Sequence, residues 1–448
     1  MSSLSTNKNW EKSFNEVTEK LFNELKAEEY LIVQFKAEHS HFVRFNNGKV
    51  RQTGIVIDAQ VCLKLIANNR IVYANFPLTG NEKNDLEIAL ENLAYLRTEI
   101  IILPPDPFIV LPENKGSSHE VYHGNLLSSD SVIETILAPV QGLDFTGYYT
   151  GGSIISANYN SLGQKHWFAT DSFFIDYSLI NANHKAIKGT FSSRHWDLDK
   201  YQHQINYHKQ ELQQLNLPIH EVKPGSYRTY LAPAAMADLL GMFSWGAISE
   251  SSLRQGGSAF AKLRQGESLS PLFNLKENFH SGNTPRFNDF GEMSPDELPL
   301  IVEGKLVNTL ISSRTALEYN LKSNGASSFE GLRSPEVASG SLSEEEILKA
   351  IDRGLYLSNL HYLNWSDRTL GKITGMTRYG CFWVENGQIV ATIKDLRFDD
   401  SLYSFFGENL LALTDFQEFI PEISTYESRS LGGCLLPGGL VDNFTFTL

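Results

Sequence analysis

The sequence predicts an α+β protein with two domains. Apolar residues at helical spacing open the chain, and strand patterns separated by tight-turn signals follow them. A polar, Gln-rich stretch then precedes a second part that is richer in Gly, Ser and short strands. We therefore expect an N-terminal domain over residues 1–198, in which helices pack on a mostly antiparallel sheet. A connecting helix over 199–217 leads to a β-rich C-terminal domain over 218–448, which is rolled or barrel-like.

The elements of the first part follow from local patterns. The first helix is predicted by apolar residues that recur every three or four positions: Trp10, Phe14, Val17, Leu21 and Leu25. Strands are predicted at 30–35, 41–45, 54–66 and 70–76. Asn47-Gly48 predicts a tight hairpin turn, because both residues tolerate a positive φ. Two further helices are expected near 86–93 and 132–137, and residues 143–180 alternate strand and turn, with one turn at 160–163.

The second part contains one apolar helix among short strands. We place this helix within residues 230–246, opened by Pro233. Hairpins are predicted around Gly304 and at Asn386-Gly387. A helix over 343–354 has the pattern of a capping box, with Ser343 at the N-cap and Glu346 three positions later.

Composition limits the classes of function. The chain carries 52 acidic against 38 basic residues, a net charge of −14, which argues against broad binding to nucleic acid. Its three cysteines are far apart and have no zinc-ligand spacing, so we expect free thiols in a reducing compartment. The N-terminus lacks the apolar region of a signal peptide, and no 18-residue apolar run is present. We expect a cytoplasmic protein without a membrane partner.

Two motifs resemble catalytic signatures. His119-Glu120-Val121-Tyr122-His123 has the form HExxH, which binds zinc when both histidines share one helical face. Glycine and serine residues flank it and leave under two turns of helix, so we interpret it as a surface loop, with a zinc site as the alternative. Ser258 follows two glycines and could present a hydroxyl group, but the sequence identifies no His or Asp partner. Motifs alone therefore show no catalytic set.

Seven segments, in order between residues 42 and 439, resemble the TldD/PmbA family, which is described as gyrase modulators and as zinc metallopeptidases. The segments are FVRFNNGKVRQTG, NYNSLG, YLAPAAMADLL, FNDFG, VEGKLVNTLISSRTALEYNL, YGCFWVENGQIVATIKDLRF and GGCLLPGG. The sixth is the most specific, because it is similar to the family's G-F-W-V-E-N-G-E segment. The resemblance covers nearly the whole chain.

The resemblance also implies which residues should bind zinc. TldD-type chains carry HExxxH on the helix that matches residues 230–246, and a cysteine near the C-terminus as a third ligand. PmbA-type chains, also called TldE, lack both. In this sequence the first histidine falls at Gly241, the glutamate at Met242, the second histidine at Gly246 and the cysteine at about Leu431, close to Cys434. Glycine, methionine and leucine at these positions cannot replace the three protein ligands of a catalytic zinc.

The resemblance therefore implies a PmbA/TldE-like subunit without a cofactor of its own. Zinc is expected in a TldD-like partner, and unfolded or short peptides are the expected substrates, held as an added strand. We expect the substrate cleft to be lined by Gly241, Met242, Trp245, Gly246 and the nearby Ser258. Two alternatives remain at this point. One is a homodimeric peptide-binding scaffold without hydrolysis, and the other is an active metallopeptidase with a different zinc site, such as His119 and His123.

Overall fold

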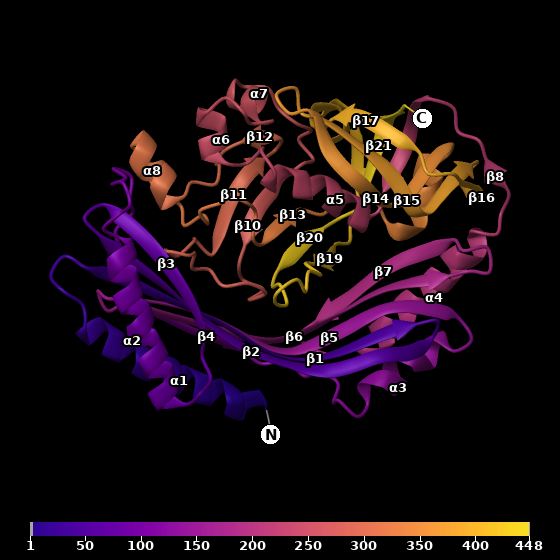
Figure 1. The fold of residues 1–448 in the computed structure, drawn as a ribbon. Helices are drawn as coiled ribbons and strands as arrows, with labels where there is room; N and C mark the ends of the chain where they lie inside the picture. The colour runs from indigo at the N-terminus through magenta and orange to yellow at the C-terminus, as the bar shows by residue number, and fades with distance from the viewer. Residues whose placement is uncertain (1–2, 448) are drawn as a thin grey trace.

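A curved seven-stranded sheet forms the base of the molecule, and the second half of the chain lies against its concave face (Figure 1). The computed structural model describes residues 3–447. The strand order is β3-β2-β1-β5-β6-β4, with β7 beside β6, and only β4 runs parallel to its neighbour. The strands of this base sheet are β1 (Tyr30–Asn46), β2 (Lys49–Ala67), β3 (Arg70–Pro77), β4 (Ser118–Tyr122), β5 (Asp144–Asn160), β6 (Lys165–Ile180) and β7 (Ala186–Ser193).

Helices cover the convex face of the base sheet at both ends (Figure 1). At one end lie α1 (Ser3–Asn23) and α2 (Glu82–Glu99); at the other lie α3 (Val132–Leu137), the short 3₁₀ turn η1 (Ala138–Val140) and α4 (Leu198–Gln214). The expected helical stripe is confirmed from Trp10 to Leu21, whereas Leu25 lies beyond the end of α1. Phe14 is buried and its ring packs against Phe35 and Tyr159. The turn at Asn47-Gly48 is also confirmed, with φ values of 50° and 65°.

The second half contains a closed barrel and a separate mixed sheet. The barrel order is β14-β9-β21-β17-β15, and β15 pairs back onto β14. Its strands are β9 (Gly225–Leu231), β14 (Gly354–Asp367), β15 (Lys372–Glu385), β17 (Arg397–Ser401) and β21 (Gly439–Phe446). At its margins lie β8 (Ile219–His220), β16 (Gln388–Ile393), β18 (Leu410–Leu413) and the π-helical turn η3 (Ser404–Glu408). The predicted α+β class and barrel-like second part are confirmed.

The mixed sheet lies beside the barrel, and both lie above the base sheet in the view of Figure 1. Its order is β12-β11-β10-β13-β20-β19. The strands are β10 (Leu275–Asn278), β11 (Glu297–Val302), β12 (Lys305–Leu306), β13 (Pro335–Val337), β19 (Glu418–Pro421) and β20 (Gly433–Leu436). The helices of this half are α5 (Pro233–Ser244), α6 (Glu250–Arg254), α7 (Ala261–Arg264), α8 (Ser313–Tyr319) and α9 (Ile347–Ile351).

Two details differ from the sequence-based expectation. The helix expected over 343–354 is a 3₁₀ turn, η2 (Glu344–Glu346), followed by the short α9, and the Ser343 side chain caps no backbone N–H. The expected connecting helix is present as α4, but it packs on the base sheet and shares a buried cluster with the barrel residues Tyr230 and Tyr356. The domain boundary expected at residues 199–217 stays a prediction. The shared core contains residues from both sides of that boundary.

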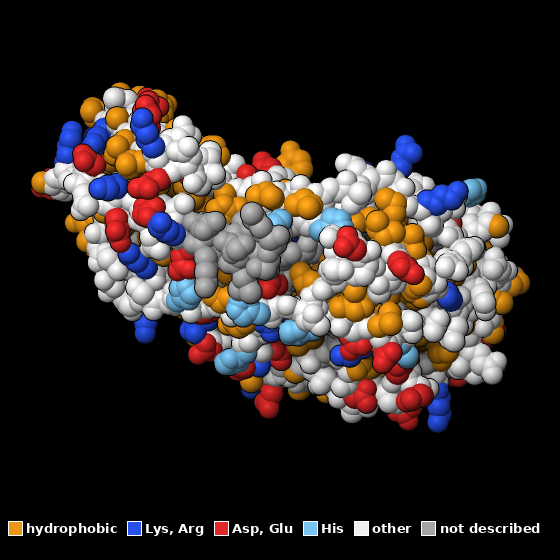
Figure 2. All heavy atoms as spheres, turned by 90° about the horizontal axis from the view of Figure 1, so that it is seen from below, with side chains coloured by type: hydrophobic (Ala, Val, Ile, Leu, Met, Phe, Trp, Pro, Cys, Tyr) orange, Lys and Arg blue, Asp and Glu red, His pale blue; other side chains and the backbone are white. Residues whose placement is uncertain are grey.

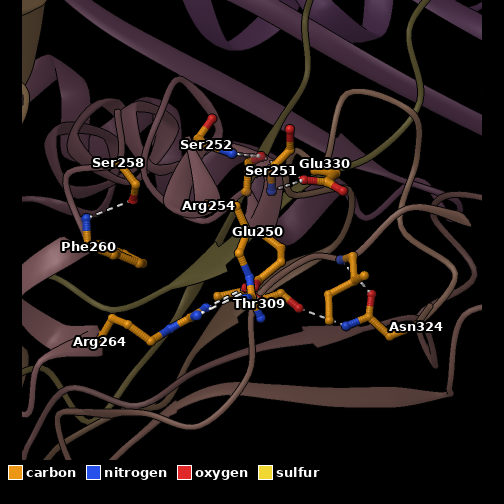
Figure 3. A network of polar contacts seen from close by, with 12 residues as sticks. Glu250, Ser251, Ser252, Arg254, Ser258, Phe260, Arg264, Thr309, Asn324 and Glu330 are labelled. Atoms are coloured by element: carbon orange, nitrogen blue, oxygen red, sulfur yellow. Dashed lines mark hydrogen bonds and ion pairs between the residues drawn. The ribbon is translucent and has the colours of Figure 1, made fainter. Parts of the chain in front are cut away.

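A buried polar network fixes the loops that follow α5 (Figure 3). Glu250 accepts hydrogen bonds from Arg254 Nε at 2.8 Å, from Thr309 Oγ1 at 2.7 Å and from the Arg264 guanidinium. Burial alone raises the pKa of Glu250, but the hydrogen bonds from Arg264, Thr309 and Arg254 outweigh it and lower the pKa below its ordinary value. Glu250 is therefore a paired, ionised group that connects α6, α7 and the segment before α8.

The outer surface carries mixed charge. In the view from below, Lys and Arg side chains are interspersed with Asp and Glu (Figure 2). The described part of this face therefore has no broad basic surface that could follow a phosphate backbone. Of the helices within residues 3–447, none combines the length and the apolar character needed to cross a membrane.

Candidate functional site

A cavity of about 370 Å³ lies between the base sheet and the mixed sheet. Strands β6 and β7 supply one wall, and β13, β19, β20 and their adjoining loops supply the other. The lining combines hydroxyl groups with apolar and charged side chains: Thr170, Ser172, Phe174, Ser192, Arg194, His195, Asn278, Glu336, Phe419, Glu422, Arg429, Leu431 and Leu435. Concave sites of this size, with apolar walls and a few polar groups, are typical of ligand-binding pockets.

Arg429 joins the two walls of the cavity. Its Nη1 donates to the carbonyl oxygen of Ser172 at 2.8 Å and its Nη2 to that of Gly152 at 2.7 Å. Its backbone N–H donates to Glu38 Oε1 at 3.3 Å. Only 5% of Arg429 is exposed, and burial lowers the pKa of its guanidinium to about 10, so the group is still positively charged at neutral pH.

Three buried polar atoms of the lining residues have no hydrogen-bond partner within the described structure. They are Thr170 Oγ1, Ser192 Oγ and Arg429 Nε. Thr170 and Ser172 are two residues apart on β6 and so lie on one face of the sheet, while Ser192 of β7 lies opposite Phe174 of β6. Buried polar groups are normally paired, so each of these three atoms marks a separate position at which a hydrogen-bond partner is absent from the protein itself.

Other charged side chains around the cavity already have contacts. Glu336 accepts from Asn278 Nδ2 at 2.5 Å and lies 3.6 Å from Lys276 Nζ. The Arg194 guanidinium lies over the Tyr122 ring, 5.0 Å from its centroid. Glu422 is exposed to solvent, where its charge is screened.

The residues expected to line the substrate cleft cluster at the C-terminal end of α5 instead. Met242 is buried in the core of the second half, and its carbonyl oxygen accepts from the N–H of Trp245 at 3.1 Å. Gly241 is exposed, and a Cβ at this position would meet no atom within 4 Å. Trp245 is 49% exposed. None of these three residues is among those that line the cavity.

Gly246 and Ser258 meet at the turn after α5. Gly246 has a φ of +95°, so the backbone conformation favours glycine there. The buried Ser258 donates to the carbonyl oxygen of Ala247 at 2.6 Å and accepts from the N–H of Phe260 at 2.9 Å (Figure 3). Both hydrogen bonds hold the local turn, and these residues also do not line the cavity.

The segment near Leu431 does reach the cavity. Leu431, near which the resemblance places a cysteine ligand, lines the cavity together with its neighbours Gly432 and Gly433. Burial raises the pKa of the nearby Cys434 thiol to about 12, with Asp238 acting in the same direction. A thiol with such a pKa is protonated at neutral pH, whereas zinc is bound by the thiolate.

Residues 119–122 of the HExxH motif lie in strand β4 and His123 follows directly, which corrects the expectation of a loop and excludes the helical zinc arrangement. His119 Nε2 lies 2.9 Å from Glu11 Oε1, and its ring stacks on Trp167. His123 is exposed at the other end of the strand, 3.9 Å from Asp171 Oδ2. Four residues of strand span roughly 13 Å, too far for two ligands of one ion. Across residues 3–447 no group of three or more His, Cys, Asp or Glu side chains is arranged to hold a metal ion.

The hydroxyl groups and Arg429 of the cavity were not identified from the sequence. The available signal is Thr170 and Ser172, two polar residues on the same face of strand β6. A polar pair on a buried face indicates contact with another polar surface. Its partner, Arg429, is 257 residues away from Ser172 in the chain, and no local pattern connects them.

A second buried polar cluster, where α4 meets β14, makes stability depend on pH. Burial raises the pKa of Glu211 from 4.5 to about 8, against the opposing effect of a hydrogen bond from Tyr356. Between these two pKa values the folded state holds a proton that the unfolded chain has lost, so stability falls as pH rises. Between about pH 5 and pH 8, we expect the free energy of unfolding of wild type to fall by up to about 1.4 kcal/mol per pH unit relative to that of Glu211→Gln.

Urea denaturation of both proteins across this pH window measures the effect. The exposed Glu221→Gln serves as the matched control and should follow the wild-type profile. Parallel profiles for wild type and Glu211→Gln would show that Glu211 is ionised in the folded protein.

Comparison with known proteins places the chain in a family. Residues 224–448, half of the chain, match the PmbA/TldA metallopeptidase C-terminal domain. Among curated proteins, none matches the chain at a significant level.

Solved structures share the fold over nearly the whole length. A protein described as a modulator of a DNA gyrase, from Thermotoga maritima, is 18% identical with a TM-score of 0.76, over 97% of this chain and 100% of its own. TldE from Thermococcus kodakarensis is 16% identical with a TM-score of 0.78, over 96% and 100%. A modulator of DNA gyrase from Bacteroides thetaiotaomicron is 14% identical with a TM-score of 0.75, over 99% of both chains. With the family domain matched over half of its length and the same fold throughout, the chain belongs to the PmbA/TldD family.

Proposed function

We propose that this chain is a PmbA/TldE-like subunit that is not itself catalytic and that helps a zinc-bearing TldD-like partner to process unfolded or short peptides. Family membership and the fold shared with TldE from Thermococcus kodakarensis support the general assignment. The chain would contribute binding surface, and the partner would supply the metal that activates water for hydrolysis.

The observation that carries the proposal is the chemistry of α5. The positions that match the family's two histidine ligands hold Gly241 and Gly246, and the glutamate position holds Met242. The third ligand, a cysteine, falls near Leu431. Met242 is packed into the core, and glycine and leucine offer no donor atom. The residues present therefore do not fit a zinc ion, and no catalytic step is assigned to this chain.

The cavity supports a role in peptide binding. It lies between strands of both halves, so one molecule of the chain supplies both walls. Hydroxyl groups of lining residues on β6 and β7 offer hydrogen bonds to a peptide backbone, and the aromatic rings of Phe174 and Phe419 offer apolar contact. Such a lining suits extended peptides with little dependence on sequence.

The purified chain, alone and mixed with a TldD-like protein, tests the proposal. We expect less than about 0.1 zinc per chain and no peptide cleavage by the chain alone, because a catalytic zinc site needs three protein ligands. Cleavage should appear only when the zinc-bearing chain is added. Zinc content is measured by atomic emission and cleavage with a fluorescent casein peptide.

The controls separate the alternatives. His119→Ala should leave zinc content and activity unchanged, since β4 keeps His119 and His123 apart. Stoichiometric zinc with turnover by the isolated chain would contradict the proposal and favour an independent metallopeptidase. A stable homodimer that binds peptides but forms no complex with the zinc-bearing chain would favour the scaffold alternative.

A further inference from the structure

A group of exposed apolar side chains lies on a free edge of the base sheet. Strand β3 pairs with β2 only from Gln60 to Ala67, so among the described strands residues 49–58 of β2 pair with β1 alone. Residues 49–57 are exposed on both faces of the sheet. They include four large apolar residues with exposed fractions of 39–61%: Val50, Ile55, Val56 and Ile57. A long, apolar edge without a partner strand is a template for pairing with another strand.

The backbone of this edge has free hydrogen-bonding groups. Ala59 accepts a hydrogen bond from the N–H of Leu78 at 2.8 Å, so its peptide groups point away from β1. Because these groups alternate in direction along a strand, the N–H and C=O groups of Thr53, Ile55 and Ile57 point the same way. Within the described structure none of them has a hydrogen-bond partner. They are therefore available to an added strand.

The charged residues of the edge are self-complementary. Lys49 and Arg51 lie at one end, and Asp58 lies at the other. Asp58 stands directly opposite the buried Glu38 of β1, and two acids in such a pair repel each other. A cation beside Asp58 would offset this repulsion. When two copies of β2 run antiparallel, the basic end of each copy lies beside the acidic end of the other.

We propose that the edge of β2 is the contact between two copies of this chain. A two-fold axis at Gly54 places Gly54 opposite its own copy and Ile55 opposite Thr53. In this register the outward groups of Ile55 and Thr53 form hydrogen-bonded pairs, and Gly54 takes a non-hydrogen-bonded position, where the Cα atoms of two strands come closest. A Cβ at Gly54 would meet no atom within 4 Å, so nothing in the described chain blocks this approach.

Pairing with a second copy joins the two base sheets into one continuous sheet. Each copy covers the other with the same residues, so the contact closes at two chains and does not extend into a fibre. None of residues 49–58 is among those that line the cavity. The contact is therefore separate from the cavity and goes beyond the proposed function.

Exchange of charge across the contact tests the proposal on the full chain. Wild type should sediment as a dimer, twice the 50.3 kDa of one chain, at about 10 µM. The first variant carries Lys49→Glu with Arg51→Glu, and the second carries Asp58→Lys. Each should dimerise at least about tenfold more weakly than wild type, because like charges meet at both ends of the contact. An equimolar mixture of the two variants should restore the dimer, because unlike charges meet again.

A third variant and its control test the apolar part of the edge. Ile55→Lys should also weaken the dimer, and circular dichroism checks its folding. Ile102→Lys, at a position that is 75% exposed and outside β2, is the matched control and should dimerise like wild type. Amide hydrogen exchange of residues 53–57 should slow when the dimer forms.

Three results would overturn the proposal. The first is a wild-type chain that stays monomeric at about 100 µM. The second is a dimer that none of the edge variants weakens, which would place the contact on another surface. The third is a pair of charge variants that stay monomeric when mixed. The zinc and cleavage measurements that test the proposed function are independent of all three results.

Discussion

Glu330→Ala is expected to lower the free energy of unfolding by about 4 kcal/mol, since three buried donors lose a charged acceptor. Glu330 is only 1% exposed and accepts from Ser249 Oγ at 2.6 Å, Ser251 N at 2.9 Å and Ser312 N at 2.8 Å. Ser249 is the N-cap of α6 and Ser312 that of α8, so one carboxylate fixes the starts of two helices. Guanidinium chloride denaturation measures the change.

Two further variants show which property of Glu330 matters. Glu330→Gln keeps the shape and one acceptor oxygen, so we expect a smaller loss, about 2 kcal/mol. The exposed Glu345→Ala is the control and should change stability by no more than about 0.5 kcal/mol. If Glu330→Ala is as stable as this control, the three hydrogen bonds do not hold the two helices together.

Phe243→Ala is expected to lower the free energy of unfolding by about 4 kcal/mol, because it leaves a large cavity in a closed core. Phe243 is fully buried on α5, with its ring centroid 4.9 Å from that of Phe260, 5.7 Å from Phe406 and 6.2 Å from Phe273. These rings belong to segments far apart in the chain, so the surrounding structure cannot close over the lost volume. Thermal and chemical unfolding both report the loss.

Trp245→Ala, two residues further along, is the matched control. This side chain is half exposed, and truncation should cost no more than about 1 kcal/mol. The comparison tests whether the buried face of α5 stabilises the fold by packing in the core. A small effect of Phe243→Ala, similar to that of Trp245→Ala, would show that α5 is loosely packed.

The sequence predicted local geometry well where one or two residues decide it. Asn386-Gly387 has φ values of 50° and 70°, as the predicted hairpin requires. The stripe from Trp10 to Leu21 is buried as predicted, because a helix presents every third or fourth residue to the same side. The candidate cleft residues, by contrast, were placed by resemblance alone. The structure puts Met242 in the core and Ser258 in a turn.

The short HExxH motif shows why a pattern without its context is weak. The same five residues bind zinc only on a helix, which brings two histidines to one side. In β4, pairing with β6 makes the segment extended, from Ser118 beside His166 to Tyr122 beside Thr170. Long-range strand pairing thus decided a conformation that the residues themselves left open.

By itself, the sequence determined the fold class, the main turns and the absence of histidine and glutamate at positions 241, 242 and 246, because these depend on residue type and on neighbours a few positions away. Only the tertiary structure decided that the barrel closes through β14 and β15, and that Arg429 meets Ser172 across 257 residues to form a cavity. The physical reason is that hydrophobic burial drives compaction without direction. Which distant polar groups then become neighbours depends on the packing of the whole chain.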